Sequence, residues 1–132
     1  LGMADRIRQR LAFDVCLPAG GQGAVGIETR TQDLATLRLL DCLHHAPTAT
    51  RVVAERTVNG RLQGGCQVPI ASFATIENDE LYLRALVGNL DGTRIIRSQM
   101  RGDIHHAEQI GLAVADDLPS QGAREILSAL LD

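Results

Sequence analysis

Between residues 70 and 101 the apolar side chains recur at every second position, which is the spacing of a β-strand with one buried face. Two turn-like stretches, ENDE at 77–80 and NLDG at 89–92, interrupt this pattern. The residues of the middle strand that would share the buried face are Leu81, Leu83, Ala85 and Val87. The sequence therefore predicts a three-stranded antiparallel meander, in which the last and most charged strand, 93–102, lies at an edge.

Segments with helical spacing lie on both sides of this meander. Residues 48–62 precede it, and a helix capped by Asp103 follows it. The apolar positions of that second helix are Ala107, Ile110, Ala113 and Val114. Pro119 and Gly122 interrupt the pattern, and a terminal helix is predicted over residues 123–131. These elements together predict an α+β fold, with a three-stranded antiparallel sheet packed against helices.

Residues 46–132 contain all of these elements and are predicted to form one domain. The residues before them have a different organisation. A short polar helix is predicted over 4–11, and a glycine-rich loop leads into an apolar strand, Ala24 to Thr29. A helix then begins near Thr31 or Gln32, with leucines along one face.

Composition excludes several classes of function. The net charge is −3 and no basic stripe is interleaved with aromatic residues, so nucleic acid is not an expected partner. No apolar stretch approaches the roughly 20 residues that span a bilayer, and no signal peptide is visible. Cys16, Cys42 and Cys66 are too widely spaced for a disulfide framework or a zinc pair, which favours a cytoplasmic protein. The opening Leu-Gly-Met leads us to expect part of a longer protein.

The segment LQGGCQVPI, residues 62–70, places Cys66 directly after two glycines. Gly64 and Gly65 provide no packing surface, but they leave the thiol accessible and the backbone free to adopt unusual φ/ψ angles. Because a thiolate is a strong nucleophile, this setting favours a nucleophile or a covalent attachment point. A buried, inert thiol in a tight turn is the alternative that spacing alone leaves open.

A second glycine-rich stretch, GGQGAVGIE at residues 20–28, surrounds Gln22. It matches neither the Walker loop nor the Gly-x-Gly-x-x-Gly pattern, because it leads into an apolar strand and not into a helix. A bare backbone beside one amide side chain is typical of a ligand contact or a hinge. A plain glycine turn is an equally compatible interpretation.

The histidines occur as two adjacent pairs, which do not form a preset ligand group. Neighbouring residues on a helix point about 100° apart, so neither pair is arranged to bind a metal. We therefore predict that His44, His45, His105 and His106 are solvated residues at helix ends, and we expect no metal site. Cys16 and Cys42 are predicted to be core or half-buried thiols without a chemical role.

Four stretches, in order, closely resemble the porphobilinogen deaminase (hydroxymethylbilane synthase) family. They are LPAGGQGAVGIE, HHAPTATRVVAERTVNGRLQGGCQVPIASFA, LYLRALVGNLDG and GAREIL. The resemblance implies an enzyme of three domains, of which this chain is the carboxy-terminal part. Residues 1–45 would be the end of domain two and a crossover strand and helix of a missing α/β domain one. Residues 46–132 would be the cofactor-carrying domain three.

By this resemblance, Cys66 carries a dipyrromethane cofactor through a thioether bond and Gln22 contacts the pyrrole ligands. The family joins four porphobilinogen molecules with loss of ammonia and releases hydroxymethylbilane. Its acid/base carboxylate and its arginines for substrate carboxylates lie in domains one and two, so no catalytic residue is expected in this chain. The implied partners are porphobilinogen, the growing pyrrole chain and the amino-terminal domains of a monomeric enzyme.

The chain departs from the family pattern at two positions. Gly20 replaces a branched residue and is expected to loosen the loop beside it, and Pro119 replaces a helix former and is expected to shorten a helix. The competing hypothesis is a non-catalytic α+β module that binds a small ligand or a partner. In such a module Cys66 would be incidental or redox-sensing.

Overall fold

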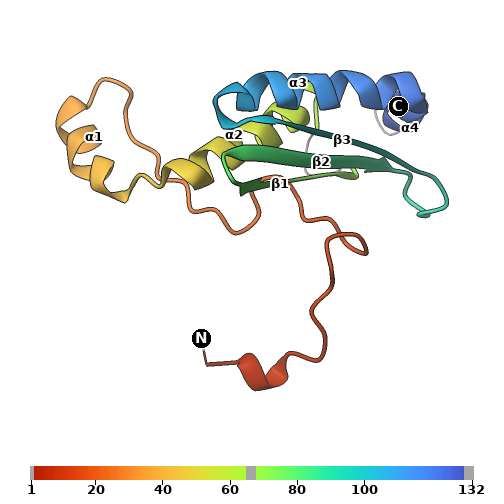
Figure 1. Cartoon of the computed structure of the whole chain (residues 1–132), viewed down its shortest axis with the longest axis horizontal. Coiled ribbons are helices and arrows are strands. Elements are labelled where there is room, and N and C mark those ends of the chain that lie inside the picture. The colour runs from red at the N-terminus through yellow and green to blue at the C-terminus, as the bar shows by residue number, and fades with distance from the viewer. Residues whose placement is uncertain (1, 65–67, 130–132) are drawn as a thin grey trace.

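The predicted meander is present in the computed structural model, which describes residues 2–64 and 68–129. Its antiparallel strands lie in the order β1 (Ile70–Glu77), β2 (Glu80–Gly88) and β3 (Ile95–Asp103) (Figure 1). The first hairpin turns at Asn78 and Asp79, with φ angles of 51° and 61°, as a two-residue hairpin requires. The α+β fold class and the edge position of the last strand are confirmed.

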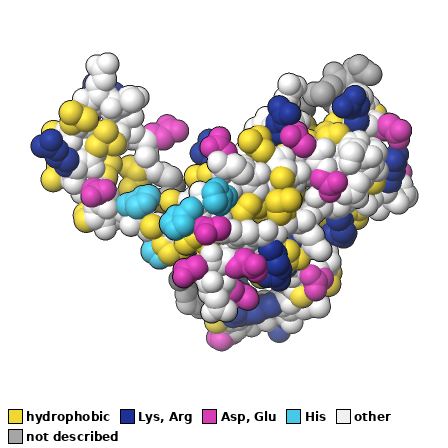
Figure 2. Space-filling model, turned by 45° about the horizontal axis from the view of Figure 1, so that its top comes forward, with side chains coloured by type: hydrophobic (Ala, Val, Ile, Leu, Met, Phe, Trp, Pro, Cys, Tyr) yellow, Lys and Arg dark blue, Asp and Glu magenta, His cyan; other side chains and the backbone are white. Residues whose placement is uncertain are grey.

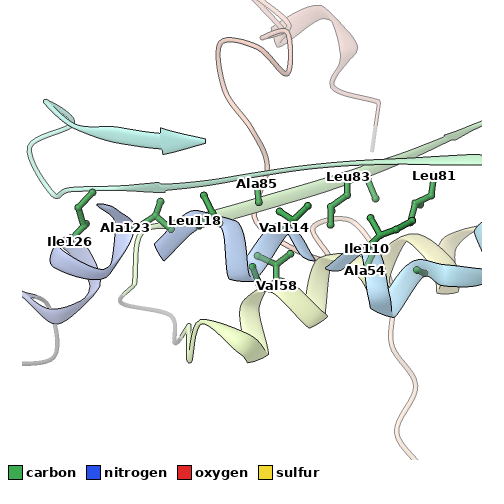
Figure 3. Packing of buried hydrophobic residues seen from close by; sticks show 14 residues of the cluster. Ala54, Val58, Leu81, Leu83, Ala85, Ile110, Val114, Leu118, Ala123 and Ile126 are labelled. Atoms are coloured by element: carbon green, nitrogen blue, oxygen red, sulfur yellow. The ribbon is translucent and has the colours of Figure 1, made fainter. Parts of the chain in front are cut away.

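Two helices, α2 (Ala46–Arg61) and α3 (Ala107–Leu118), cover one face of the sheet (Figure 1). The alternation predicted for β2 is confirmed, because Leu81, Leu83 and Val87 are wholly buried and Ala85 is 2% exposed. These side chains meet apolar side chains of both helices in a cluster of 14 buried residues between positions 54 and 126 (Figure 3). The buried hydrophobic cluster therefore lies between the sheet and the two helices.

The helix boundaries follow local sequence signals. Pro47 stands in the first turn of α2, where its missing N–H costs nothing. Asp103 accepts a hydrogen bond of 2.8 Å from the His105 N–H at the 3₁₀ turn before α3. A π-helical turn, Pro119–Ala123, follows α3 directly and leads to α4 (Arg124–Ser128); Pro119 keeps helical angles, and Gly122, with a φ of 102°, makes the kink. The cap and the break at Gly122 are confirmed, whereas Pro119 does not interrupt the helical backbone.

Close packing of α2 against α3 requires a glycine at position 111. A Cβ atom there would lie 2.7 Å from both the Ala54 carbonyl oxygen and the Thr57 Cβ. We expect Gly111→Ala to lower the free energy of unfolding by about 1–2 kcal/mol, because the clash outweighs the gain in helix propensity. Chemical denaturation of the purified chain measures this change.

Gly60→Ala is the matched control, because a Cβ at Gly60 has no heavy atom within 4 Å. The same gain in helix propensity should raise the free energy of unfolding by about 0.5–1 kcal/mol there. A Gly111→Ala variant as stable as Gly60→Ala would contradict the close approach of the two helices.

The helix predicted over residues 4–11 is wrong. The structure has only a 3₁₀ turn, Ala4–Arg6, at this place. Ile7 and Leu11 are 52% and 55% exposed, so the apolar positions of the expected helix are not buried. An isolated helix shorter than about 12 residues is marginal in water, which accounts for the difference.

The segment predicted as a crossover strand, Ala24 to Thr29, forms no strand here. These residues have no regular structure and do not join the sheet of β1, β2 and β3. Val25 is 90% exposed and Ile27 is 55% exposed. Because a strand needs a neighbour for its N–H and C=O groups, a pattern of apolar residues alone does not make one.

Helix α1 (Leu34–Leu40) begins after Asp33 and not at the predicted Thr31 or Gln32. The Asp33 carboxylate accepts hydrogen bonds from the Thr36 N–H (3.1 Å) and the Thr36 hydroxyl (2.8 Å), which lower the pKa of this carboxyl group. The side chain of Leu34 is 62% exposed, so one apolar face of α1 is uncovered. Within the described residues, no helix combines the length and the apolar character that crossing a bilayer requires.

Candidate functional site

The cysteine loop, residues 62–69, connects the end of α2 to the start of β1. Cys66 itself lies outside the described residues, so its predicted role is assessed from the flanking positions. The Gly64 N–H donates to the Asn59 carbonyl oxygen at 2.8 Å. A Cβ at Gly64 would lie 2.6 Å from Asn59 Oδ1 and 2.9 Å from Ile70 Cδ1. A side chain at position 64 would therefore need the Asn59 and Ile70 side chains to move, a packing constraint that the sequence interpretation did not include.

The glycine loop, residues 19–24, consists of two overlapping turns. Gln22 N–H donates to the Ala19 carbonyl (3.0 Å), and Ala24 N–H donates to the Gly21 carbonyl (3.1 Å). Gly21 and Gly23 occupy the third position of each turn, with φ angles of 75° and 83° that favour glycine. Gln22 therefore lies between two turns that need glycine on either side of it.

The Gln22 side chain is exposed and partly fixed. Its Oε1 accepts a hydrogen bond of 3.2 Å from the Ala19 N–H, which folds the amide back over its own turn. Among the described residues, its Nε2 has no hydrogen-bond partner. An amide NH₂ carries two donors, so this side chain can bind a carboxylate or a carbonyl oxygen of a ligand.

Glu55 on α2 connects the glycine loop to the sheet. Its carboxylate accepts hydrogen bonds from the Gly21 N–H and from the Ala74 N–H on β1, both at 2.7 Å. Gly20, the residue before Gly21, packs against α2 and β1, where an added Cβ would lie 2.7 Å from the Ser72 hydroxyl. The small residue at position 20 permits close packing of the loop against α2 and β1, whereas the predicted loosening of the loop stays a prediction.

The two loops contact the same helix one turn apart. Glu55 binds Gly21, and Asn59, four residues further along α2, binds Gly64. Four residues of α-helix rise about 6 Å. The loop of Gln22 and the start of the loop of Cys66 therefore contact α2 at residues four positions apart, although Gln22 and Cys66 are more than 40 residues apart in sequence.

An open cavity of about 680 Å³ lies between the glycine loop, the α1 region and α2. Gly21 lines it from the loop, and Arg56 and Asn59 line it from α2. Among the described residues, Arg56 forms no ion pair. The Arg56 guanidinium and the Asn59 amide can both donate hydrogen bonds, and such donors suit a ligand that carries carboxylate groups.

A family model describes this part of the chain. The model for "Porphobilinogen deaminase, C-terminal domain" matches residues 49–120, which is more than half of the sequence. The chain belongs to this family. The match includes Cys66, most of α2, the whole sheet and α3, whereas Gln22 and the glycine loop lie before it. The resemblance of the cysteine segment to the deaminases is therefore confirmed at the level of the domain.

The histidines of this deaminase-family chain lie where the sequence predicted. His44 and His45 lie at the start of α2, His105 and His106 lie before α3, and all four are exposed. Figure 2 shows histidine side chains at the surface beside the arm that carries α1. Among the described residues, no three His, Cys, Asp or Glu side chains come together to bind a metal ion.

The prediction for the other two cysteines is wrong. Cys16 and Cys42 are both exposed, not buried. Each belongs to the region of residues 1–45 that contributes no side chain to the buried hydrophobic cluster. The Cys42 thiol donates only to the Leu39 carbonyl oxygen, at 3.3 Å.

Sequence reasoning missed three residues of this deaminase-family site, Glu55, Arg56 and Asn59. A signal existed for Glu55, which lies next to Ala54 and three positions before Val58, both wholly buried. An acidic residue on the apolar face of a helix needs hydrogen-bond donors around it, so this pattern predicts a buried carboxylate with specific partners. Arg56 and Asn59 are three positions apart on α2 and both line the cavity.

Proposed function

We propose that this chain is the carboxy-terminal part of a porphobilinogen deaminase, which condenses four porphobilinogen molecules into hydroxymethylbilane with loss of ammonia. The observation that carries the proposal is the arrangement on α2, within the family match. The loop that contains Cys66 and the loop that contains Gln22 contact this helix one turn apart. A growing pyrrole chain attached at one loop would therefore start beside the other.

Two residues on α2, Arg56 and Asn59, fit the carboxylate groups of a dipyrromethane attached to the Cys66 sulfur. The cavity beside α2 is about 680 Å³, and Arg56 and Asn59 on its wall can donate to the acetate and propionate groups of pyrroles. When bound, a dipyrromethane supplies the primer to which porphobilinogen units are joined. The chain's own residues would hold this primer and its carboxylates in a fixed orientation.

The acid/base chemistry would come from elsewhere in the enzyme. Glu55 already accepts two backbone N–H groups, so its oxygens are engaged in the fold. Asp41, on the cavity wall, is solvent-exposed and is not shielded from water. By analogy with the family, the carboxylate that assists ammonia loss and the arginines that bind substrate belong to amino-terminal domains.

Residues 1–45 would be the contact region for those domains. Eleven large hydrophobic side chains of this region are exposed, among them Val15, Val25 and Leu39, at 73%, 90% and 76%. Exposed apolar side chains at this density mark a surface that packs against another part of a protein. We propose a cytoplasmic, monomeric enzyme in which these side chains are covered.

Mass spectrometry of the whole enzyme, expressed with its amino-terminal domains, tests the proposal. We expect the peptide that contains Cys66 to carry a covalent dipyrromethane, because attachment precedes every round of chain growth. The peptides that contain Cys16 and Cys42 are internal controls and should carry none. An active enzyme with an unmodified Cys66 peptide would contradict the proposed attachment.

A further inference from the structure

Glu55 is a buried carboxylate with an unusual set of partners. Its residue is 5% exposed and it lies on α2 between the glycine loop and β1. Oε2 accepts from the Gly21 N–H and Oε1 accepts from the Ala74 N–H, both at 2.7 Å. Gly21 is 34 residues before Glu55 and Ala74 is 19 residues after it. One side chain therefore connects two distant segments to one helix.

Only a carboxylate satisfies both donors. A glutamine has one acceptor oxygen and an NH₂ group that cannot accept a hydrogen bond, and an alanine has neither. A buried carboxylate is costly to desolvate unless donors replace its water, and backbone N–H groups at this distance form strong charge-assisted bonds. Among the described residues, no Lys, Arg or His forms an ion pair with Glu55. The Glu55 carboxylate therefore interacts with backbone N–H groups and holds two segments of the chain in place.

The segment that precedes the glycine loop has its own contact with the sheet. Phe13 packs against Phe73 on β1, with ring centroids 4.3 Å apart, and the Arg84 guanidinium on β2 lies 5.3 Å from the Phe13 ring. Phe13 contacts the sheet before the glycine loop, and Glu55 contacts the loop itself. Residues 13–21 are thus attached to the C-terminal domain at both ends.

We propose that Glu55 is a positioning residue that makes the glycine loop move with the C-terminal domain. Gln22 would then keep a constant place relative to the cysteine loop, even when the amino-terminal domains shift during chain growth. This inference rests on the proposed function, in which Gln22 contacts the pyrrole chain. The anchoring itself can be tested separately in the chain described here.

The first experiment measures amide hydrogen exchange by NMR in the 132-residue chain and in Glu55→Gln. The amide keeps one of the two acceptor oxygens that the donors now use separately, and the loop is the less constrained of the two segments. We expect the Gly21 amide to exchange about tenfold faster or more, because it loses a charge-assisted bond. The Ala74 amide, within β1, should stay protected. Unchanged exchange at Gly21 would overturn the anchoring role.

Glu77→Gln is the matched control, because it removes the same charge from an exposed position at the end of β1. It should leave Gly21 exchange unchanged. Gly20→Ala is a second variant that keeps the carboxylate, in case Glu55→Gln does not fold. Its Cβ would lie 2.7 Å from the Ser72 hydroxyl and should displace the loop from Glu55, so Gly21 exchange should again rise. Unchanged exchange in this variant would also count against the anchor.

The second experiment is a double-mutant cycle in the whole enzyme. If Glu55 acts through Gln22, Glu55→Gln should reduce kcat/KM about tenfold in the parent enzyme, but less than about twofold in a Gln22→Ala background. Equal losses in both backgrounds would mean that Glu55 only stabilises the fold. An enzyme that makes no hydroxymethylbilane and carries nothing on Cys66 would reject the proposed function. In that case the exchange data alone would still decide whether the loop is anchored.

Discussion

Replacing Cys66 with serine in the whole enzyme should reduce hydroxymethylbilane formation to background. A serine hydroxyl ionises far less readily than a thiol, so it would not form the bond that holds the primer. Gly64 packs closely against Asn59 before the substituted position, and serine differs from cysteine by one atom, so the loop should keep its path. The loss would then arise from the missing sulfur. Activity assays and the mass of the Cys66 peptide measure it together.

Cys42→Ser and Cys16→Ser are matched controls for this substitution. Both thiols are exposed and lie in the region outside the buried hydrophobic cluster. Each variant should keep its adduct on Cys66 and turn over at the parent rate. Near-normal turnover of Cys66→Ser, with no pyrrole adduct on any peptide, would reject the attachment site.

The elements that the sequence predicts well are those whose signals are local. In β2, alternation alone places Leu81 and Leu83 in the core, because a strand turns every second side chain to one face. Asp103 caps the turn before α3 through a hydrogen bond from a residue only two positions away. The segment from Ala24 to Thr29 shows the limit of such signals: its apolar residues suit a strand, but a strand also requires a neighbouring one.

The candidate site was harder to predict because long-range contacts assemble it. The chain distance from Gly21 to Glu55 is 34 residues, and no periodic pattern connects the two. Gly64 could be read as a residue that leaves a thiol accessible, but its contact with Asn59 depends on the path of the chain after α2. The role of Cys66 came from the resemblance to the deaminases, because spacing alone left an inert thiol possible.

The purified 132-residue chain should form no measurable hydroxymethylbilane from porphobilinogen. A thiol and a set of hydrogen-bond donors can hold a pyrrole chain, but they do not help ammonia to leave. General acid/base catalysis contributes about 10²- to 10⁴-fold, and charge stabilisation contributes a further 10²- to 10³-fold or so. Among the described residues around the cavity, Glu55 has both oxygens engaged with backbone N–H groups and Asp41 is exposed to water, so neither contribution has an evident source there.

The same reasoning predicts the state of the thiol and the way to restore activity. Because attachment of the primer would use the complete active site, the chain expressed alone should carry Cys66 unmodified. Co-expression with the amino-terminal domains of a deaminase should yield both the adduct and turnover, since the exposed apolar side chains of residues 1–45 would then be covered. Co-expression of the Cys66→Ser chain is the control and should yield neither. Steady turnover by the chain alone would mean that its own residues supply the acid/base chemistry, and Asp41, on the cavity wall, would be the first side chain to substitute.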